Sequence, residues 1–181
     1  MTSRNHTDEK IAANTGQMTH AAVIRLAEPG DRDVVACIAE SAYAPYISRM
    51  DKKPAPMTED YASRIKDKSL YVLESIEEAA GSRSMPPAPR VRGFLVLLPE
   101  SEAVLLDNVA VAPDAQGQGF GKMLMLFAEE KARAAGYDTI YLYTNEVMME
   151  NLKLYARLGY AETHRTKDKG FNRVFMAKKL R

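Results

Sequence analysis

The chain has 181 residues, a formal net charge of +1 and 27% charged residues. This length suits one well-buried domain and is short for two. The near-neutral charge provides no strong electrostatic footprint for nucleic acid or an anionic membrane, and no apolar run is long enough to span a bilayer.

Hydrophobic periodicity and turn residues divide the chain into regular elements. Residues 1–20 are polar and without pattern, which predicts a disordered leader before a single domain at 21–181. The expected elements, in chain order, are a strand at 22–26, helices at 31–44 and 58–68, strands at 70–76, 93–98 and 103–111, a helix at 120–135, a strand at 139–144, a helix at 148–158, and strands at 162–167 and 171–178. The order β-α-α-β-β-β-α-β-α-β-β predicts one α/β (α+β) domain with helices flanking a sheet.

Three local predictions accompany this assignment. Asp31 stands where the N-cap of the first helix is expected. Cys37 falls among apolar residues of that helix, which predicts a buried structural thiol. As the only cysteine, it cannot form an internal disulfide, which favours a reducing, cytoplasmic location. Residues 77–90 contain one glycine and three prolines and are expected to form a mobile hairpin loop.

A glycine-rich loop joins the strand at 103–111 to the helix at 120–135. Gly117, Gly119 and Gly121 leave backbone N–H groups without a Cβ in the way. At a helix N-terminus, such donors together with the positive end of the helix dipole favour a phosphate or pyrophosphate. The loop therefore indicates a phosphorylated ligand.

Two well-known phosphate loops do not match. A P-loop needs glycine and Ser/Thr where this chain has Gln116 and Met123. The Gly-x-Gly-x-x-Gly fingerprint of dinucleotide-binding folds fails because Lys122 and Leu124 stand at its last position in the two available registers. The histidines are scattered without the spacing of metal ligands, so no metal site is expected.

Two further patterns do match and lie about thirty residues apart. The loop fits Gln/Arg-x-x-Gly-x-Gly/Ala, and a downstream segment fits Asn-x-x-x-Tyr-x-x-x-Gly-Tyr; the matching residues are Gln116, Gly119 and Gly121, then Asn151, Tyr155, Gly159 and Tyr160. In this order they resemble the GCN5-related N-acetyltransferase (GNAT) family. The resemblance covers roughly residues 22–180 and is strongest over 103–163.

The resemblance implies a mixed, mostly antiparallel sheet split into a V, with acetyl-CoA as co-substrate and no metal. It implies direct attack of a primary amine, of a small molecule or peptide, on the thioester in a ternary complex, and often a homodimer. A bulge of the strand near Val109–Val111 is expected to provide the oxyanion donor. The implied cofactor-binding residues are Val109, Ala110, Val111, Gln116, Gly117, Gln118, Gly119, Phe120, Gly121, Lys122 and Asn151.

Two residues are candidate catalytic groups. Asp107 is a carboxylate within an apolar strand, on the face shared with Val109, and could serve as the base; its alternative role is capping a backbone group. Glu146 is a second candidate. Tyr155 stands where the family has the acid that protonates the departing thiolate, although a tyrosine on a helix face could also pack in the core.

Acceptor binding is expected from the first two helices and the final strand pair. Tyr43, Tyr46 and Tyr61 are candidates for a substrate wall, with packing at the core edge as the alternative. Asn145 is expected to serve a turn or helix cap. A non-catalytic acetyl-CoA-binding regulatory module is the competing function, and an ordinary nucleotide-binding protein is a third reading that the failed loop patterns count against.

Overall fold

The computed structural model describes residues 22–50, 52–76 and 89–180. These residues form a seven-stranded sheet of order β1-β2-β3-β4-β5-β7-β6. The strands are β1 (Ala22–Leu26), β2 (Leu70–Ile76), β3 (Pro89–Pro99), β4 (Val104–Val111), β5 (Thr139–Asn145), β6 (Ala161–Asp168) and β7 (Phe171–Lys179). The helices are α1 (Arg32–Tyr43), α2 (Tyr61–Lys66), α3 (Phe120–Ala134) and α4 (Met149–Arg157), with short 3-10 helices that include η2 (Ala44–Arg49) and η3 (Ala55–Thr58).

The predicted order of strands and helices is confirmed. The main differences lie between α1 and β2, where η2 and η3 occupy a segment expected to be a loop. There, α2 begins at Tyr61 rather than Thr58, because the side chain of Asp60 accepts a hydrogen bond from the backbone N–H of Ser63 and caps the helix. The predicted leader at 1–20 and most of the predicted loop at 77–90 lie outside the described residues.

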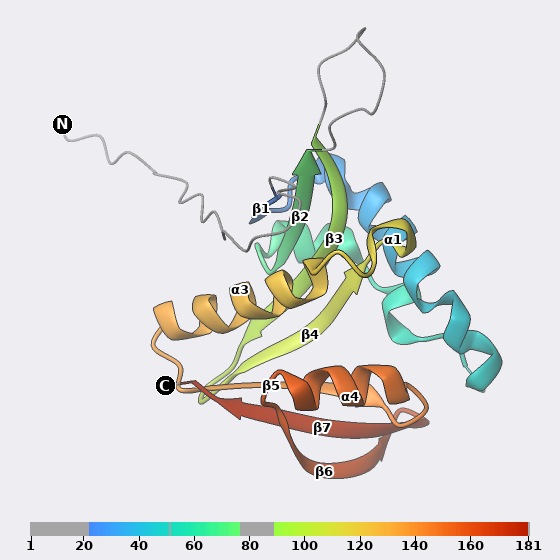
Figure 1. The fold of residues 1–181 in the computed structure, drawn as a ribbon, viewed down its shortest axis with the longest axis vertical. Helices are drawn as coiled ribbons and strands as arrows, with labels where there is room; N and C mark the ends of the chain where they lie inside the picture. The colour runs from blue at the N-terminus through green and yellow to red at the C-terminus, as the bar shows by residue number, and fades with distance from the viewer. Residues whose placement is uncertain (1–21, 51, 77–88, 181) are drawn as a thin grey trace, which may run out of the picture.

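The sheet is split between β4 and β5. β4 and β5 pair in parallel, whereas β4 pairs antiparallel with β3 and β5 pairs antiparallel with β7. Their ladder extends only from Val104 to Leu106 on β4, opposite Ile140 to Leu142 on β5. Beyond that point the strands diverge, as Figure 1 shows. The expected V-shaped, mostly antiparallel sheet is therefore confirmed, and the opening faces the glycine-rich loop.

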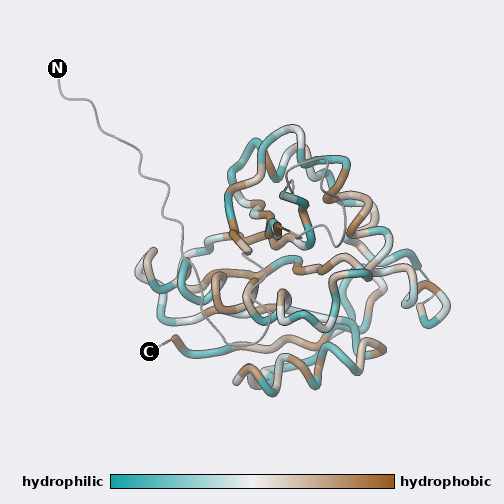
Figure 2. The backbone as a smooth tube through the Cα atoms, turned by 45° about the horizontal axis from the view of Figure 1, so that its top comes forward, coloured by the Kyte–Doolittle hydropathy of each residue, from teal (hydrophilic) through white to brown (hydrophobic). Residues whose placement is uncertain are grey.

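The core lies around β3 and β4, which are buried along most of their length. Both α1 and α3 pack on these two strands. The buried face of α3 carries Leu124, Met125 and Ala128 at helical spacing. Figure 2 shows hydrophobic segments along the central strands. This packing fixes the C-terminal end of β4 and the N-terminal end of α3, the two ends that the glycine-rich loop connects.

Of the two predictions about α1, the N-cap position of Asp31 is confirmed and the burial of Cys37 is wrong. Asp31 precedes the helix as predicted, but its carboxylate accepts hydrogen bonds from the backbone N–H of Glu28 and from Arg25, not from the helix. Cys37 is exposed, so the predicted buried thiol is wrong. The buried stripe of α1 consists of Val35, Ile38 and Ala39, and position 37 falls on the solvent side of that stripe.

Gly93 on β3 allows close approach between β3, β4 and α3. A Cβ at this position would lie 2.8 Å from the carbonyl oxygen of Ala110 and 3.1 Å from Cδ1 of Leu124. We expect Gly93→Ala to lower the free energy of unfolding by about 1–3 kcal/mol, since overpacking forces backbone or rotamer shifts. Urea unfolding measures this change. Gly30→Ala is the control, because a Cβ there meets nothing within 4 Å; equal stability of the two variants would contradict the prediction.

Candidate active site

The glycine-rich loop makes a tight turn into α3. Gly117 and Gly119 have φ of +80° and +86°, a left-handed conformation that L side chains rarely adopt. Gly119 is the N-cap of α3 and has no side chain to cap the helix, so the positive end of the helix dipole faces this turn. The side chain of Gln116 donates to the carbonyl oxygen of Val111 at 3.2 Å, which ties the turn to the end of β4.

A cavity, here called the loop-side cavity, runs from this turn along β4 to α4. Of the predicted cofactor-binding residues, those that line it are Val109, Ala110, Val111, Gln116, Gly117, Phe120, Gly121 and Asn151. Gln118, Gly119 and Lys122 do not line it. Gln118 instead donates to the carbonyl oxygen of Asp114, and Lys122 is exposed at the start of α3.

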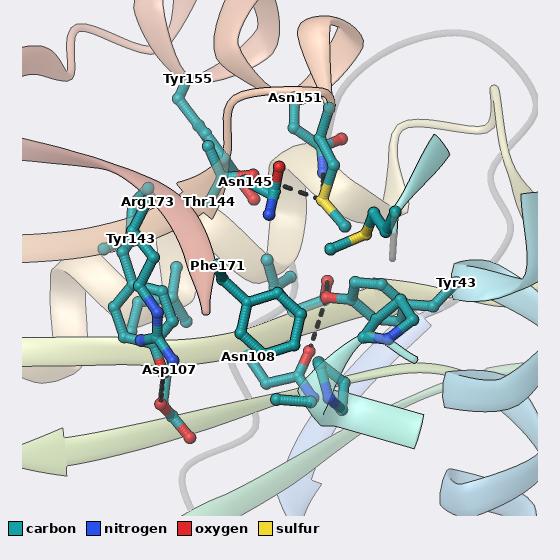
Figure 3. Close-up of a pocket in the computed structure, with 18 residues that line it drawn as sticks. Tyr43, Asp107, Asn108, Tyr143, Thr144, Asn145, Asn151, Tyr155, Phe171 and Arg173 are labelled. Carbon is teal, nitrogen blue, oxygen red and sulfur yellow. Dashed lines mark hydrogen bonds between the residues drawn. The ribbon is translucent and has the colours of Figure 1, made fainter. Parts of the chain in front are cut away.

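A second cavity, the strand-side cavity, lies where β4 and β5 diverge. Its walls come from residues 106–109 of β4 and residues 142–145 of β5, and Pro54–Pro56 and Phe171 also line it. Figure 3 shows Asp107 and Asn108 on one side and Tyr155 and Asn151, from α4, on the other. This cavity combines apolar walls with a few polar groups, as small-molecule sites commonly do.

The two cavities meet. Tyr43, Val109, Asn151 and Tyr155 line both of them. We call this set of four residues the junction. A molecule lying along the loop-side cavity can therefore meet a molecule that occupies the strand-side cavity, and the meeting point is bounded by two phenols, one amide side chain and the backbone of β4.

Tyr155 is held deep in the junction. Its side chain is buried, and its ring lies 6.2 Å from that of Tyr160, centroid to centroid. Burial raises the pKa of Tyr155 above its ordinary value, so the phenol keeps its proton at neutral pH. Asn151 lies one turn earlier on α4 and approaches Sδ of Met148 at 3.7 Å.

Asp107 occupies a β-bulge. On β3, Val96 pairs with Asn108 and Leu97 pairs with Leu106, which leaves Asp107 as the extra residue. The expected bulge near Val109–Val111 is wrong, because that stretch pairs regularly with β3. A bulge re-aims side chains, and here the adjacent residues Asp107 and Asn108 both line the strand-side cavity.

The carboxylate of Asp107 is already engaged. It accepts a hydrogen bond from the hydroxyl of Tyr143 at 2.5 Å and lies 3.4 Å from the guanidinium of Arg64. Burial and this carboxylate together raise the pKa of Tyr143 to about 12. The guanidinium of Arg173 lies 3.9 Å from the centroid of the Tyr143 ring. Asp107 is therefore oriented by its neighbours and still reaches the cavity.

The three tyrosines that were predicted to form a substrate wall lie in three different places. Tyr43 belongs to the junction, whereas Tyr46 lines only the loop-side cavity of the two. Tyr61 lines neither, because its ring is 4% exposed and packs edge-on against Phe94 in the core. Its hydroxyl contacts Asn108, so it reaches the site through hydrogen bonds rather than as a wall.

The remaining predicted residues, Asn145 and Glu146, make hydrogen bonds within the fold. Asn145 accepts from the backbone N–H of Val147 at 3.1 Å, a turn role as predicted. Glu146 accepts from the side chain of Asn172 and lines neither cavity. Met148 is buried, whereas Met149 is 56% exposed.

Sequence reasoning missed Asn108, Tyr143 and Arg173. Asn108 carried a signal, because an amide inside an apolar strand is as unusual as the carboxylate beside it. Tyr143 and Arg173 carried no such signal, since the contact between their side chains depends on the pairing of β5 with β7. In that pairing Tyr143 stands opposite Phe175, and Asn145 stands opposite Arg173.

Neither a metal cluster nor a membrane span is found in the described part of the chain. No group of three or more His, Cys, Asp or Glu residues there could hold a metal ion. No helix within 22–50, 52–76 and 89–180 is long and apolar enough to cross a bilayer.

A split sheet with a glycine-rich loop beside a junction of two cavities is the arrangement that the resemblance to the GNAT family implies. Residues 37–160 match the model of the acetyltransferase (GNAT) family. The chain belongs to this family. Its expected fold is confirmed, and the family match supports an N-acetyltransferase enzyme.

Curated relatives match over part of their length. An N-acetyltransferase of Bacillus subtilis, YvbK, is 37% identical over 67 residues, which cover 37% of this chain and 43% of that protein. The aminoalkylphosphonate N-acetyltransferase of Salmonella typhimurium is 36% identical over 59 residues, 33% of this chain and 38% of that protein. The chain thus spans less than half the length of these relatives.

Solved structures agree on the fold. The ribosomal-protein-S18-alanine N-acetyltransferase of Escherichia coli has a TM-score of 0.65 and 19% identity, with 88% of this chain and 94% of that chain covered. The PaiA N-acetyltransferase of Thermoplasma acidophilum in complex with coenzyme A has a TM-score of 0.66 and 16% identity, with 87% and 98% covered.

Proposed function

We propose that residues 21–181 form an acetyl-CoA-dependent N-acetyltransferase that acts on a primary amine of a small molecule or peptide. The observation that carries this proposal is the junction, where Tyr43, Val109, Asn151 and Tyr155 line both cavities. Holding two reactants against one another in this way makes attack effectively unimolecular. That geometry supports direct transfer in a ternary complex.

The loop-side cavity suits the donor. The left-handed glycines turn the chain so that the start of α3, with the positive end of its dipole, lies at one end, where a pyrophosphate is favoured. Beyond Leu106, the edge of β4 that faces β5 has no strand partner within the described sheet. Backbone groups of Val109–Val111 on that edge can pair with the pantetheine arm and stabilise the oxyanion.

The strand-side cavity suits the acceptor. An alkylamine with a pKa of about 10.4 is uncharged in only about one part in a thousand at neutral pH, so a base near the amine increases the reactive form. Among the described residues that line this cavity, Asp107 carries the only carboxylate. We assign Asp107 as the base, acting on the amine directly or through water. Tyr155 donates its proton to the thiolate as the C–S bond breaks.

We expect Asp107→Asn to lower kcat/KM by about 100-fold at pH 7, the lower part of the range for general base catalysis. The amide keeps the shape and the hydrogen bond with Tyr143 but cannot take a proton. The deficit should shrink as pH rises, because the fraction of neutral amine then increases without a base. Steady-state kinetics from pH 6 to pH 10 measure both effects.

Glu146→Gln is the matched control for this variant. It removes another carboxylate, one that lies outside both cavities, and should leave the pH profile unchanged. A constant ratio of the wild-type and Asp107→Asn rates across this pH range would contradict the base assignment.

The proposed function itself is tested by release of the CoA thiol from acetyl-CoA in the presence of amines. The panel comprises alkylamines, polyamines, aminoglycosides, aminoalkylphosphonates, amino acids and peptides, with thermal shift as the binding measurement. Amine-dependent thiol release supports the enzyme. Stabilisation by acetyl-CoA without any such release would indicate the non-catalytic module, and binding of neither acetyl-CoA nor CoA would overturn both.

A further inference from the structure

A chain of hydrogen bonds leads from the wall of the strand-side cavity to the junction. The hydroxyl of Tyr61 donates to the carbonyl oxygen of Pro56 at 2.7 Å. Nδ2 of Asn108 donates to the hydroxyl oxygen of Tyr61 at 3.1 Å, and the hydroxyl of Tyr43 donates to Oδ1 of Asn108 at 2.9 Å. Figure 3 shows this last contact beside the cavity.

The direction of this chain is set by its first member. A backbone carbonyl can only accept a hydrogen bond, so the short contact at Pro56 requires the proton of Tyr61. The oxygen of Tyr61 is then left to accept, which requires the NH₂ group of Asn108. The amide oxygen of Asn108 therefore points to Tyr43 and can only accept, so Tyr43 must donate.

Asn108 has little freedom to depart from this arrangement. Its side chain is 5% exposed, and a buried amide with unmatched groups is costly. The other acceptor near the Tyr43 hydroxyl is the carbonyl oxygen of Val109 at 3.5 Å, which would also take its proton. Burial keeps the pKa of Tyr43 well above its ordinary value, so this phenol stays neutral.

We propose that the hydroxyl oxygen of Tyr43 accepts a hydrogen bond from an N–H of the acceptor amine, and that Asn108 is the positioning residue that restricts this oxygen to accepting. The inference rests on the proposed function, because it assigns a recognition role within the same site. Tyr43 lines both cavities, so its free lone pair lies at the junction where the amine must attack.

The chemistry of acetyl transfer fits an acceptor-only oxygen. A neutral primary amine has a lone pair and two N–H bonds. The lone pair forms the C–N bond, the C–S bond breaks, and one amine proton passes to the base. The other N–H remains in the amide product, and this is the one that Tyr43 holds throughout. A secondary amine has a single N–H and loses either this contact or the proton transfer, so primary amines are selected.

Two conjugates of coenzyme A test the inference without knowledge of the natural acceptor. In the first, the CoA sulfur is joined through –CH₂–C(=O)– to butylamine, so an amide N–H stands where the attacking nitrogen would be. In the second, the same bridge carries butanol, and an ester oxygen replaces that N–H. Isothermal titration calorimetry measures both dissociation constants, with CoA itself as the reference for the donor site.

We expect the wild-type protein to bind the amide conjugate about tenfold more tightly than the ester, as a lost hydrogen bond between buried groups implies. In Tyr43→Phe this preference should fall to about twofold or less while CoA binds as before. Asn108→Leu should also reduce it, because the carbonyl oxygen of Val109 at 3.5 Å is then the remaining acceptor, and the Tyr43 hydroxyl can leave this long contact and donate to the ester. Tyr61→Phe, which only frees the amide of Asn108 to flip, provides the same readout if Asn108→Leu does not fold.

Tyr141→Phe is the control, since its hydroxyl donates to Glu100 at 2.8 Å in an exposed hydrogen bond, outside both cavities. Its amide preference should equal that of the wild type. The inference would be overturned if Tyr43→Phe kept the preference for the amide conjugate over the ester conjugate. It would also be overturned if the wild-type protein bound CoA but showed no such preference. Either result would leave the proposed function standing. A protein that binds neither CoA nor either conjugate would remove the proposed function, and the inference with it.

Discussion

Gly119→Val is expected to raise the dissociation constant for acetyl-CoA at least ~100-fold, the equivalent of losing two hydrogen bonds to charged groups at about 1.5–3 kcal/mol each. Gly119 has φ of +86°, and a β-branched residue there is a strong steric outlier. The turn should relax to a negative φ and rotate the first N–H groups of α3 away from the phosphates.

Strain, not collision, is the cause of this effect. A Cβ at Gly119 meets nothing within 4 Å, and the residue does not itself line the loop-side cavity. The valine therefore acts by changing the direction of the backbone at the helix N-cap. Fluorescence or calorimetric titration with acetyl-CoA measures the loss, and circular dichroism checks that the domain remains folded.

Gly136→Val is a closely matched control. Gly136 has φ of +88°, open space around its Cβ, and a place just after the C-terminal end of the same helix, outside the loop-side cavity. Its backbone strain should be similar, so its loss of stability should be similar. If Gly136→Val weakens acetyl-CoA binding as much as Gly119→Val, the turn has no specific role in binding.

Most residues of the loop-side cavity on the turn and on β4 could be predicted because the determinants of this region are local. A glycine turn, a helix N-terminus and the preceding strand lie within Val104–Ala134, and glycine permits the positive φ that Gly117 and Gly119 adopt. The order of strands and helices was predictable for the same reason, since each element carries its own periodicity. Even so, Gln118, Gly119 and Lys122 proved not to line the cavity, because a turn points only some of its residues inward.

The arrangement of the strand-side cavity could not be predicted because it depends on contacts distant in sequence. The bulge at Asp107 is a property of how β4 pairs with β3, and no pattern within β4 reveals it. The chain of hydrogen bonds from Pro56 to Tyr43 joins four elements, η3, α2, β4 and α1, with Asn108 and Tyr61 separated by 47 positions. Cys37 shows the same limit on a smaller scale, since apolar neighbours in sequence did not place it on the buried side of α1.

Tyr155→Phe is expected to lower kcat by about 100-fold, near the lower end of the range for general acid catalysis, since a thiolate already leaves fairly well. The ring and its packing against Tyr160 are retained, so the dissociation constant for acetyl-CoA and the folded stability should change little. Burial raises the pKa of the Tyr155 phenol, so the acid stays protonated as pH rises and is lost only above its ordinary value of about 10. The wild-type rate should therefore show no decline from this group up to that pH.

The control Tyr160→Phe distinguishes a catalytic role of the Tyr155 hydroxyl from a role in packing. Tyr160→Phe removes a buried hydroxyl beside the same ring but outside both cavities, and it should leave kcat unchanged. Initial rates of thiol release at saturating acetyl-CoA compare the two variants. Unchanged turnover in Tyr155→Phe would reduce Tyr155 to an aromatic residue of the core, because the phenol oxygen is the only atom that the substitution removes. A loss confined to Tyr155→Phe, with acetyl-CoA affinity retained, requires that this oxygen act on the reaction itself.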